Sequence, residues 1–225
     1  MSRKAFKHNF LAVPKLEQSN LESGRVYVGE GFSFPSITTV LSKTKDTSFL
    51  RKWKAKVGEE AAARITSAAN RRGTAMHSLC ERYLLNEDLG TLGYTQGELL
   101  FRAIRQHLDE FEEIRALETR LFSKRLKVAG SVDCVAVVGG VLTVIDFKTS
   151  SKEKQEEYIE DYFLQGCFYL NAFWELSGDL PRQVRILIAL ENGSTQVFDL
   201  RGSRIVEYTK LLEQRIESYY ANKTE

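Results

Sequence analysis

Two aspartates and a lysine on a predicted hairpin are the residues of this sequence best suited to chemistry. Gly-Ser-Val-Asp ends at Asp133, and Val-Ile-Asp-Phe-Lys supplies Asp146 and Lys148. Between them, Gly139 and Gly140 are typical of a two-residue β-hairpin turn. Counting outward from this turn places Asp133 opposite Asp146, and Lys148 shares the face of Asp146 because side chains alternate along a strand. The spacing therefore predicts all three side chains on one face of a sheet.

That face is otherwise apolar, which constrains how the two carboxylates can be accommodated. Opposed like charges on neighbouring strands, about 5 Å apart, destabilise a sheet. When partly buried, they must take up a proton, pair with a cation or bind a metal ion. Mg²⁺ prefers one or two carboxylates together with water and phosphate oxygens. A metal site then places Lys148 where it can orient a water and stabilise developing charge. The alternative interpretation is a structural Asp–Lys–Asp cluster without a metal.

The elements that must position these residues follow from hydrophobic periodicity, which predicts one domain over residues 1–225. We expect a helical N-terminal part at about 34–116, a sheet core at about 117–200 and a closing helix at about 203–221. Helices are expected over residues 48–70, 74–85, 98–115 and 157–176, and strands over 117–122, 126–138, 141–148, 184–190 and 195–200. Trp53, on the first of these helices, is predicted to lie in the core. This order indicates an α/β (α+β) fold with a central mixed sheet flanked by helices.

Composition excludes several other classes of protein. The chain has 225 residues with 43% hydrophobic and 28% charged residues, as in a soluble globular protein, and no run of residues is apolar enough to span a membrane. Its formal net charge of +2 excludes a histone-like basic coat but leaves room for a local basic groove. The three cysteines, Cys80, Cys134 and Cys167, form no Cys-x-x-Cys pair, so a four-cysteine iron–sulfur cluster is not expected. Their pattern is typical of a reducing, intracellular compartment.

Five motifs occur in an order that is recognisable. They are Phe-Pro-Ser36-Ile-Thr38-Thr-Val-Leu, Gly-Thr-Ala-Met-His77, Gly-Ser-Val-Asp133, Val-Ile-Asp146-Phe147-Lys148-Thr-Ser and Gln165-Gly-Cys-Phe-Tyr169. The set resembles the PD-(D/E)xK nuclease superfamily in its RecB-like exonuclease branch. Its layout is most similar to the mitochondrial genome maintenance exonucleases and their bacterial and phage relatives. The resemblance covers roughly residues 34–200 and implies a restriction-endonuclease-like core.

The resemblance also implies a metal-dependent deoxyribonuclease with catalytic Asp133, Asp146 and Lys148. Asp133 and Asp146 would bind one or two Mg²⁺ or Mn²⁺ ions, with His77 and the backbone carbonyl of Phe147 as further ligands. Lys148 would serve the attacking water. Without this resemblance, a solvent-facing pair with Glu81, four residues on, would be the simpler interpretation of His77.

Further residues are candidates for support of the site or for contact with DNA. Glu118 precedes the predicted hairpin and is expected either to assist the metal site or to form a surface salt bridge. Gln165 and Tyr169 share one helix face, for contact with DNA or support of the site, and a buried amide such as Gln165 needs partners. Candidates of the same kind are Ser36, Thr38 and Arg72. Residues 43–56 are rich in lysine and carry aromatic side chains, a combination that suits single-stranded DNA.

The expected function is that of a metal-dependent exonuclease that acts on single-stranded DNA with a free end. The alternatives are a structure-selective or sequence-specific endonuclease of the same superfamily, and a non-catalytic DNA-binding or scaffold protein on the nuclease fold. Replication or recombination proteins are candidate partners, and no membrane association is expected. The chain lacks a long N-terminal extension, which favours the cytoplasm of a bacterium or of a phage-infected cell.

Overall fold

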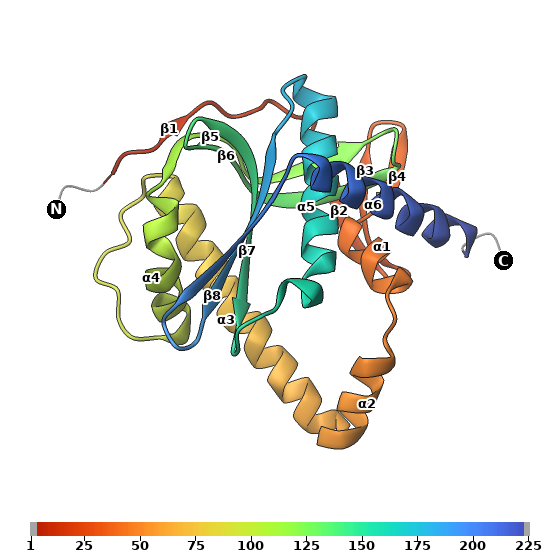
Figure 1. The fold of residues 1–225 in the computed structure, drawn as a ribbon, viewed down its shortest axis with the longest axis horizontal. Helices are drawn as coiled ribbons and strands as arrows, with labels where there is room; N and C mark the ends of the chain where they lie inside the picture. Colours follow the sequence, from red (N-terminus) through yellow and green to blue (C-terminus); the bar gives the residue numbers. More distant parts are fainter. Residues whose placement is uncertain (1–3, 223–225) are drawn as a thin grey trace.

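A six-stranded mixed sheet forms the centre of the computed structural model, which describes residues 4–222 (Figure 1). Its strand order is β1-β5-β6-β7-β8-β9. The strands are β1 (Lys7–His8), β5 (Phe111–Ser123), β6 (Val128–Val138), β7 (Val141–Ser150), β8 (Gln183–Leu190) and β9 (Thr195–Arg201). The pairs β1–β5 and β7–β8 are parallel, and the other neighbouring pairs are antiparallel. The predicted architecture, a mixed sheet flanked by helices, is confirmed.

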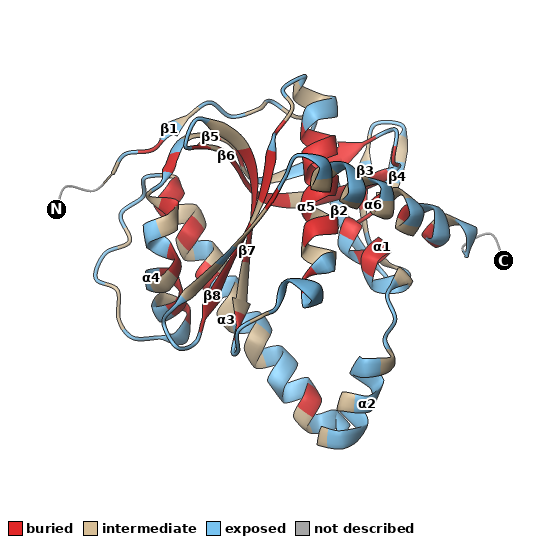
Figure 2. Ribbon diagram, in the orientation of Figure 1, coloured by how far each residue is buried: buried red, intermediate tan, exposed pale blue. Residues whose placement is uncertain are grey.

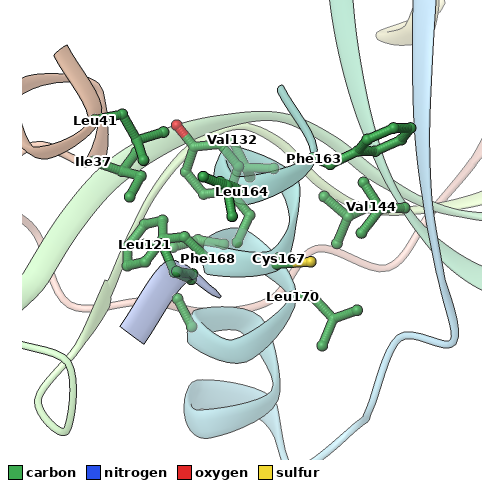
Figure 3. Packing of buried hydrophobic residues seen from close by; sticks show 14 of the residues in the cluster. Ile37, Leu41, Leu121, Val132, Val144, Phe163, Leu164, Cys167, Phe168 and Leu170 are labelled. Carbon is green, nitrogen blue, oxygen red and sulfur yellow. The ribbon is translucent and has the colours of Figure 1, made fainter. Parts of the chain in front are cut away.

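Helices cover both faces of this sheet. They are α1 (Ile37–Thr44), α2 (Ser48–Val57), α3 (Glu59–Leu84), α4 (Gln96–Leu108), α5 (Glu160–Ser177) and α6 (Ser203–Ala221), with a short 3₁₀ turn η1 (Glu156–Tyr158) before α5. One core cluster lies between the sheet and α1, α5 and α6 (Figure 3). A second lies between the sheet and α3 and α4. Strands buried on both faces explain why β6 and β7 are apolar on both sides. Within residues 4–222, no helix combines the length and apolarity that a membrane span requires.

A small antiparallel sheet near the N-terminus was not expected from the sequence. It consists of β2 (Glu17–Leu21), β3 (Gly24–Gly29) and β4 (Phe32–Pro35). All five residues of β2 are exposed, so the alternation of buried and exposed side chains that marks a strand is missing there. Of this small sheet, only the end of β4, at residues 34 and 35, falls within the part at about 34–116 that was expected to be helical.

Several predicted boundaries are wrong. The helices expected over 48–70 and 74–85 are instead α2 and α3, which meet at Gly58 with a φ of 84°. The helix expected over 98–115 ends at Leu108, and β5 already begins at Phe111, so the sheet core starts six residues before Leu117. The helical spacing of apolar residues continues from α4 into the start of β5, so the sequence does not show where the helical period gives way to the strand period.

Helix α2 and the first half of α3 project away from the sheet, and their surface is largely exposed (Figures 1 and 2). No residue of α2 is buried, and Phe49 is 80% exposed. Trp53 is half-buried, so its predicted place in the core is wrong. The second half of α3 is packed against the sheet and brings His77 to Phe147 of β7.

Candidate active site

The β6–β7 hairpin has the predicted register up to its last backbone pair. Both turn glycines have positive φ angles, 56° and 75°, and the strands pair from Val138–Val141 to Cys134–Ile145. The expected backbone pairing of Asp133 with Asp146 is not made. Instead, Asp133 Oδ2 accepts a hydrogen bond of 2.7 Å from the backbone N–H of Phe147. The strands separate at this point, and a carboxylate takes over the position of a backbone acceptor.

The separation coincides with a break in side-chain alternation on β5 and β6. Leu117 and Cys134 pack beneath α3 and α4, whereas Leu121 and Val132 pack on the opposite face. Residues an even number of positions apart on a regular strand would share one face. Glu118 lies between the two leucines with a φ of 43°, a left-handed backbone conformation that is uncommon for residues other than glycine.

Glu118, Asp133 and His77 meet at this irregularity. His77 Nδ1 lies 3.9 Å from Glu118 Oε1 and 3.8 Å from Asp133 Oδ1. One ligand atom from each of the three residues lies within 4.8 Å of the other two. The structure therefore places Glu118, for which the sequence left a surface salt bridge open, beside His77 and Asp133.

The Phe147 carbonyl orients the imidazole of His77. The Phe147 carbonyl oxygen is 2.8 Å from His77 Nε2. Because a carbonyl can only accept a hydrogen bond, Nε2 carries the hydrogen and donates the bond. The Nδ1 lone pair is then directed toward Glu118 and Asp133. A hydrogen bond from the second ring nitrogen to a carbonyl is the usual support for a metal-binding histidine. Phe147, expected to bind a metal through its carbonyl, is here also the residue that sets the tautomer of His77.

Asp146 and Lys148 form a buried ion pair next to this cluster. The Lys148 ammonium contacts Asp146 Oδ2, and Asp146 is 1% exposed. Within residues 4–222, Asp146 Oδ1 has no hydrogen-bond partner. A buried carboxylate oxygen without a partner is unfavourable unless a cation or a proton satisfies it.

Burial and charge together set the protonation of the site. Burial raises the pKa of Asp146 to about 6, against the opposing effect of Lys148, and burial likewise raises the pKa of Asp133. Burial alone would lower the pKa of His77, but Glu118 and Asp133 raise it above its ordinary value. Burial also opposes the charge of Lys148, yet Asp146 and Asp133 raise its pKa, so the side chain stays an ammonium. An imidazole nitrogen and three carboxylates, one of which has an oxygen without a hydrogen-bond partner in the described chain, fit a divalent cation bound through oxygen and nitrogen.

We expect the Glu118→Gly substitution to stabilise the metal-free protein while weakening its affinity for Mn²⁺. A left-handed conformation costs a residue with a Cβ about 1 kcal/mol, and glycine avoids this cost. Glu118→Gln is the matched control, because it removes the charge and keeps the strained backbone. The measurements are denaturant unfolding in EDTA and calorimetric titration with Mn²⁺. If the glycine variant is less stable than the glutamine variant, the left-handed backbone conformation of Glu118 is not strained.

We expect the metal-free protein to become less stable as the pH rises from about 5.5 to about 7.5. In this range the folded chain still binds protons at Asp146 and His77, because both pKa values lie above those of the unfolded chain. Stability therefore falls as the pH rises through the folded pKa, by about 1 kcal/mol for Asp146 alone. Denaturant unfolding in EDTA across this range measures the slope. Asp146→Asn should flatten it, and an unchanged slope in that variant would refute the assignment.

The candidates for DNA contact fall into two groups. Gln165 donates a hydrogen bond of 3.3 Å from Nε2 to the Tyr169 hydroxyl, which lies so close to Gly130 that an added Cβ would be 3.0 Å away. Ser36 is buried as the N-cap of α1, accepting a hydrogen bond of 3.0 Å from Thr39 N. Tyr169 and Ser36 are thus both buried, Tyr169 on α5 and Ser36 at the start of α1.

The other two candidates lie at the surface or in an ion pair. Thr38 is exposed at the first turn of α1. Arg72 pairs with Glu191 at 3.0 Å, and its Nε has no hydrogen-bond partner within the described chain. The sequence did not predict the contact of Tyr162 with Lys148, whose Nζ lies 5.0 Å from the centroid of the Tyr162 ring.

A pocket of about 330 Å³ opens onto the cluster and is lined by Gly73, Thr74, His77, Ser78, Glu81 and Glu118. A larger hollow of about 910 Å³ follows α3 toward α2 and shares Thr74 and Ser78 with this pocket. Lys54 and Arg71 contribute positive charge to the larger hollow. The larger hollow, lined by alanine as well as polar and charged side chains, thus adjoins the pocket at the cluster.

Comparison with known proteins connects this geometry to a family. The chain is 33% identical over 151 residues to mitochondrial genome maintenance exonuclease 1 of Xenopus tropicalis, covering 62% of this chain and 43% of that protein. It is 35% identical over 130 residues to the protein of the same name from Mus musculus, covering 54% of this chain and 38% of that protein. The chain thus spans less than half the length of these relatives.

A solved structure and a family match complete the comparison. The crystal structure of a phage-related exonuclease from Haemophilus somnus 129PT aligns with a TM-score of 0.38 and 15% identity, over 68% of this chain and 82% of that one. Residues 93–220 match the PD-(D/E)XK nuclease superfamily. The matched segment contains Glu118, Asp133, Asp146 and Lys148. With more than half of its residues in this match, the chain belongs to the PD-(D/E)XK nuclease superfamily.

Proposed function

We propose that this protein is a metal-dependent DNA exonuclease that acts on single-stranded DNA with a free end. The observation that carries the proposal is the cluster of His77, Glu118 and Asp133 beside the buried Asp146–Lys148 pair. The names of the curated relatives, both exonucleases, favour removal of nucleotides from an end.

In this proposal each side chain has a defined task. Asp133, Asp146, Glu118 and His77 would hold one or two Mg²⁺ or Mn²⁺ ions, together with the Phe147 carbonyl. A bound divalent ion supplies an activated water and neutralises charge on the phosphate. Lys148 remains an ammonium and so donates hydrogen bonds, orienting the water and stabilising negative charge at the scissile phosphate.

The projecting surface of α2 and α3 favours an unpaired strand as the substrate. Phe49 is 80% exposed, and Lys52, Lys54 and Lys56 are exposed on the same helix. Exposed aromatic rings stack on unpaired bases, and neighbouring lysines attract the phosphates. In duplex DNA the base faces are already stacked and are not available to such a ring.

The same proposal covers the setting of the enzyme. Residues 1–225 act as one nuclease domain in the cytoplasm of a bacterium or a phage-infected cell, alongside replication or recombination proteins. The names of the two relatives described above point to mitochondria instead. Localisation of a tagged chain in its native cell decides between the two compartments.

Incubation with 5′-labelled linear single-stranded DNA, internally labelled circular single-stranded DNA and 5′-labelled linear duplex DNA tests the proposed activity. We expect Mg²⁺ or Mn²⁺ to support degradation of the linear single strand alone, and EDTA or Lys148→Ala to abolish it. Lys152→Ala is the matched control, because this lysine is exposed in the loop that follows β7.

The other outcomes lead to the alternative functions. Cutting of the circle would show an endonuclease of the same superfamily. Binding of DNA without metal-dependent cutting would show a scaffold protein on the nuclease fold. Equal degradation of duplex and single-stranded DNA would overturn the substrate preference and leave the nuclease assignment standing.

A further inference from the structure

The aromatic ring of Tyr162 lies against the ammonium group of Lys148. Lys148 Nζ is 5.0 Å from the centroid of the ring, within the range of a cation–π interaction. The only anionic group in direct contact with Lys148 within residues 4–222 is Asp146, its ion-pair partner. Lys148 comes from β7 and Tyr162 from α5, so the contact joins the sheet to the helix that covers it.

The ammonium group needs more than one neighbour to hold its position. A lysine side chain has a flexible four-carbon stem, and one ion pair leaves the stem free to move around its partner. The ring contacts the ammonium as a second, independent neighbour. We propose, building on the nuclease function above, that Tyr162 is a positioning residue whose ring holds the Lys148 ammonium in its working position.

Tyr162 itself is held firmly by its neighbours in the chain. Its backbone N–H donates a hydrogen bond of 2.9 Å to Ile159 O, and both Ile159 and Phe163 are fully buried. The carboxylate of Asp161, the residue before Tyr162, forms ion pairs with Lys45 at 2.5 Å and with Arg215 at 3.4 Å. These contacts fix the backbone of the first turn of α5, from which the Tyr162 ring extends to Lys148.

The contact depends on the ring and not on the hydroxyl. None of the hydrogen bonds within residues 4–222 uses the Tyr162 hydroxyl. Phenylalanine therefore supplies the same aromatic face, whereas leucine fills part of the space without it. The two substitutions separate positioning by the ring from any role of the hydroxyl.

Steady-state kinetics on linear single-stranded DNA test the proposal. We expect Tyr162→Leu to lower kcat about tenfold with little change in KM, and Tyr162→Phe to stay within about twofold of the wild type. Tyr208→Leu is the matched control for lost packing, because the Tyr208 ring packs edge-on against Phe163 at 5.3 Å. This control should keep the kcat of the wild type.

A spectroscopic measurement on the metal-free protein is independent of catalysis. The ring shifts the Lys148 Hε resonances upfield, observed with ¹³C-labelled lysine and assigned from their absence in Lys148→Met. The shift should persist in Tyr162→Phe and in Tyr208→Leu and disappear in Tyr162→Leu.

Each other result overturns the proposal in a distinct way. A Tyr162→Leu enzyme with unchanged kcat would show that the ring does not position the lysine. A raised KM with unchanged kcat would make Tyr162 a DNA contact, and equal loss in the phenylalanine variant would assign the effect to the hydroxyl. If the wild type degrades no DNA, the proposed function fails, and the lysine shifts alone then decide whether the ring holds the ammonium.

Discussion

Asp146→Asn should lower kcat/KM on linear single-stranded DNA by about a thousandfold. Asparagine has nearly the same shape, so the surrounding packing is retained. The substitution removes the buried negative charge that pairs with Lys148. It also changes the carboxylate whose other oxygen, Oδ1, has no hydrogen-bond partner within the described chain. Both the proposed metal site and the placement of the ammonium depend on that charge. Initial rates at saturating Mg²⁺, together with calorimetric titration with Mn²⁺, measure the two effects.

Stability distinguishes this loss from simple unfolding. Asparagine removes the cost of burying a carboxylate but leaves the Lys148 ammonium without its ion-pair partner, and we expect the metal-free variant to remain folded at neutral pH. Asp179→Asn is the matched control, since Asp179 is 53% exposed and pairs with Arg115 on the surface. Activity within tenfold of the wild type would exclude Asp146 from the catalytic site.

Gly166→Ala should destabilise the protein by about 2 kcal/mol, although alanine is the better helix former. Gly166 lies on α5 where the helix crosses β8, and an added Cβ would lie 2.2 Å from Val184 Cγ1. This distance is far inside van der Waals contact, so the helix or the strand must shift. Because α5 carries Gln165 and Tyr162, the same shift should lower the activity. Thermal unfolding and nuclease assays measure both consequences.

A second substitution tests the steric origin of this effect. Val184→Ala alone leaves a cavity and should cost about 2 kcal/mol. In the double variant, the new alanine methyl occupies part of the space that the valine leaves. We expect the double variant to be more stable than the sum of the single effects predicts, by about 1 kcal/mol or more. Strictly additive losses would show that the close approach of Gly166 to Val184 is not the cause.

The sequence predicts the β6–β7 hairpin because its signals are local. Two glycines at the turn set the register, and alternation carries that register as far as Cys134 and Ile145. The contact between Asp146 and Lys148 follows from the same two-residue period. Residue types at fixed spacing were therefore sufficient for this half of the candidate site.

The other half depends on features that leave no local signal. Glu118 has a left-handed backbone conformation that no glycine or asparagine marks in the sequence, and the break in alternation at Asp133 accompanies it. Phe111 continues the helical spacing of α4 although it begins a strand. In both places tertiary packing overrides the local pattern, so periodicity assigned the wrong element or the wrong face.

The pairing of β1 with β5 has a consequence for the order in which the chain can fold. Lys7 pairs with Glu113, and Phe6 is buried against residues of α3 and α4. During synthesis on a ribosome, Phe6 stays without its binding surface until more than a hundred further residues have emerged. The first strand of the sheet thus cannot dock before β5 has emerged, and contacts of such high sequence separation slow the folding of the whole domain.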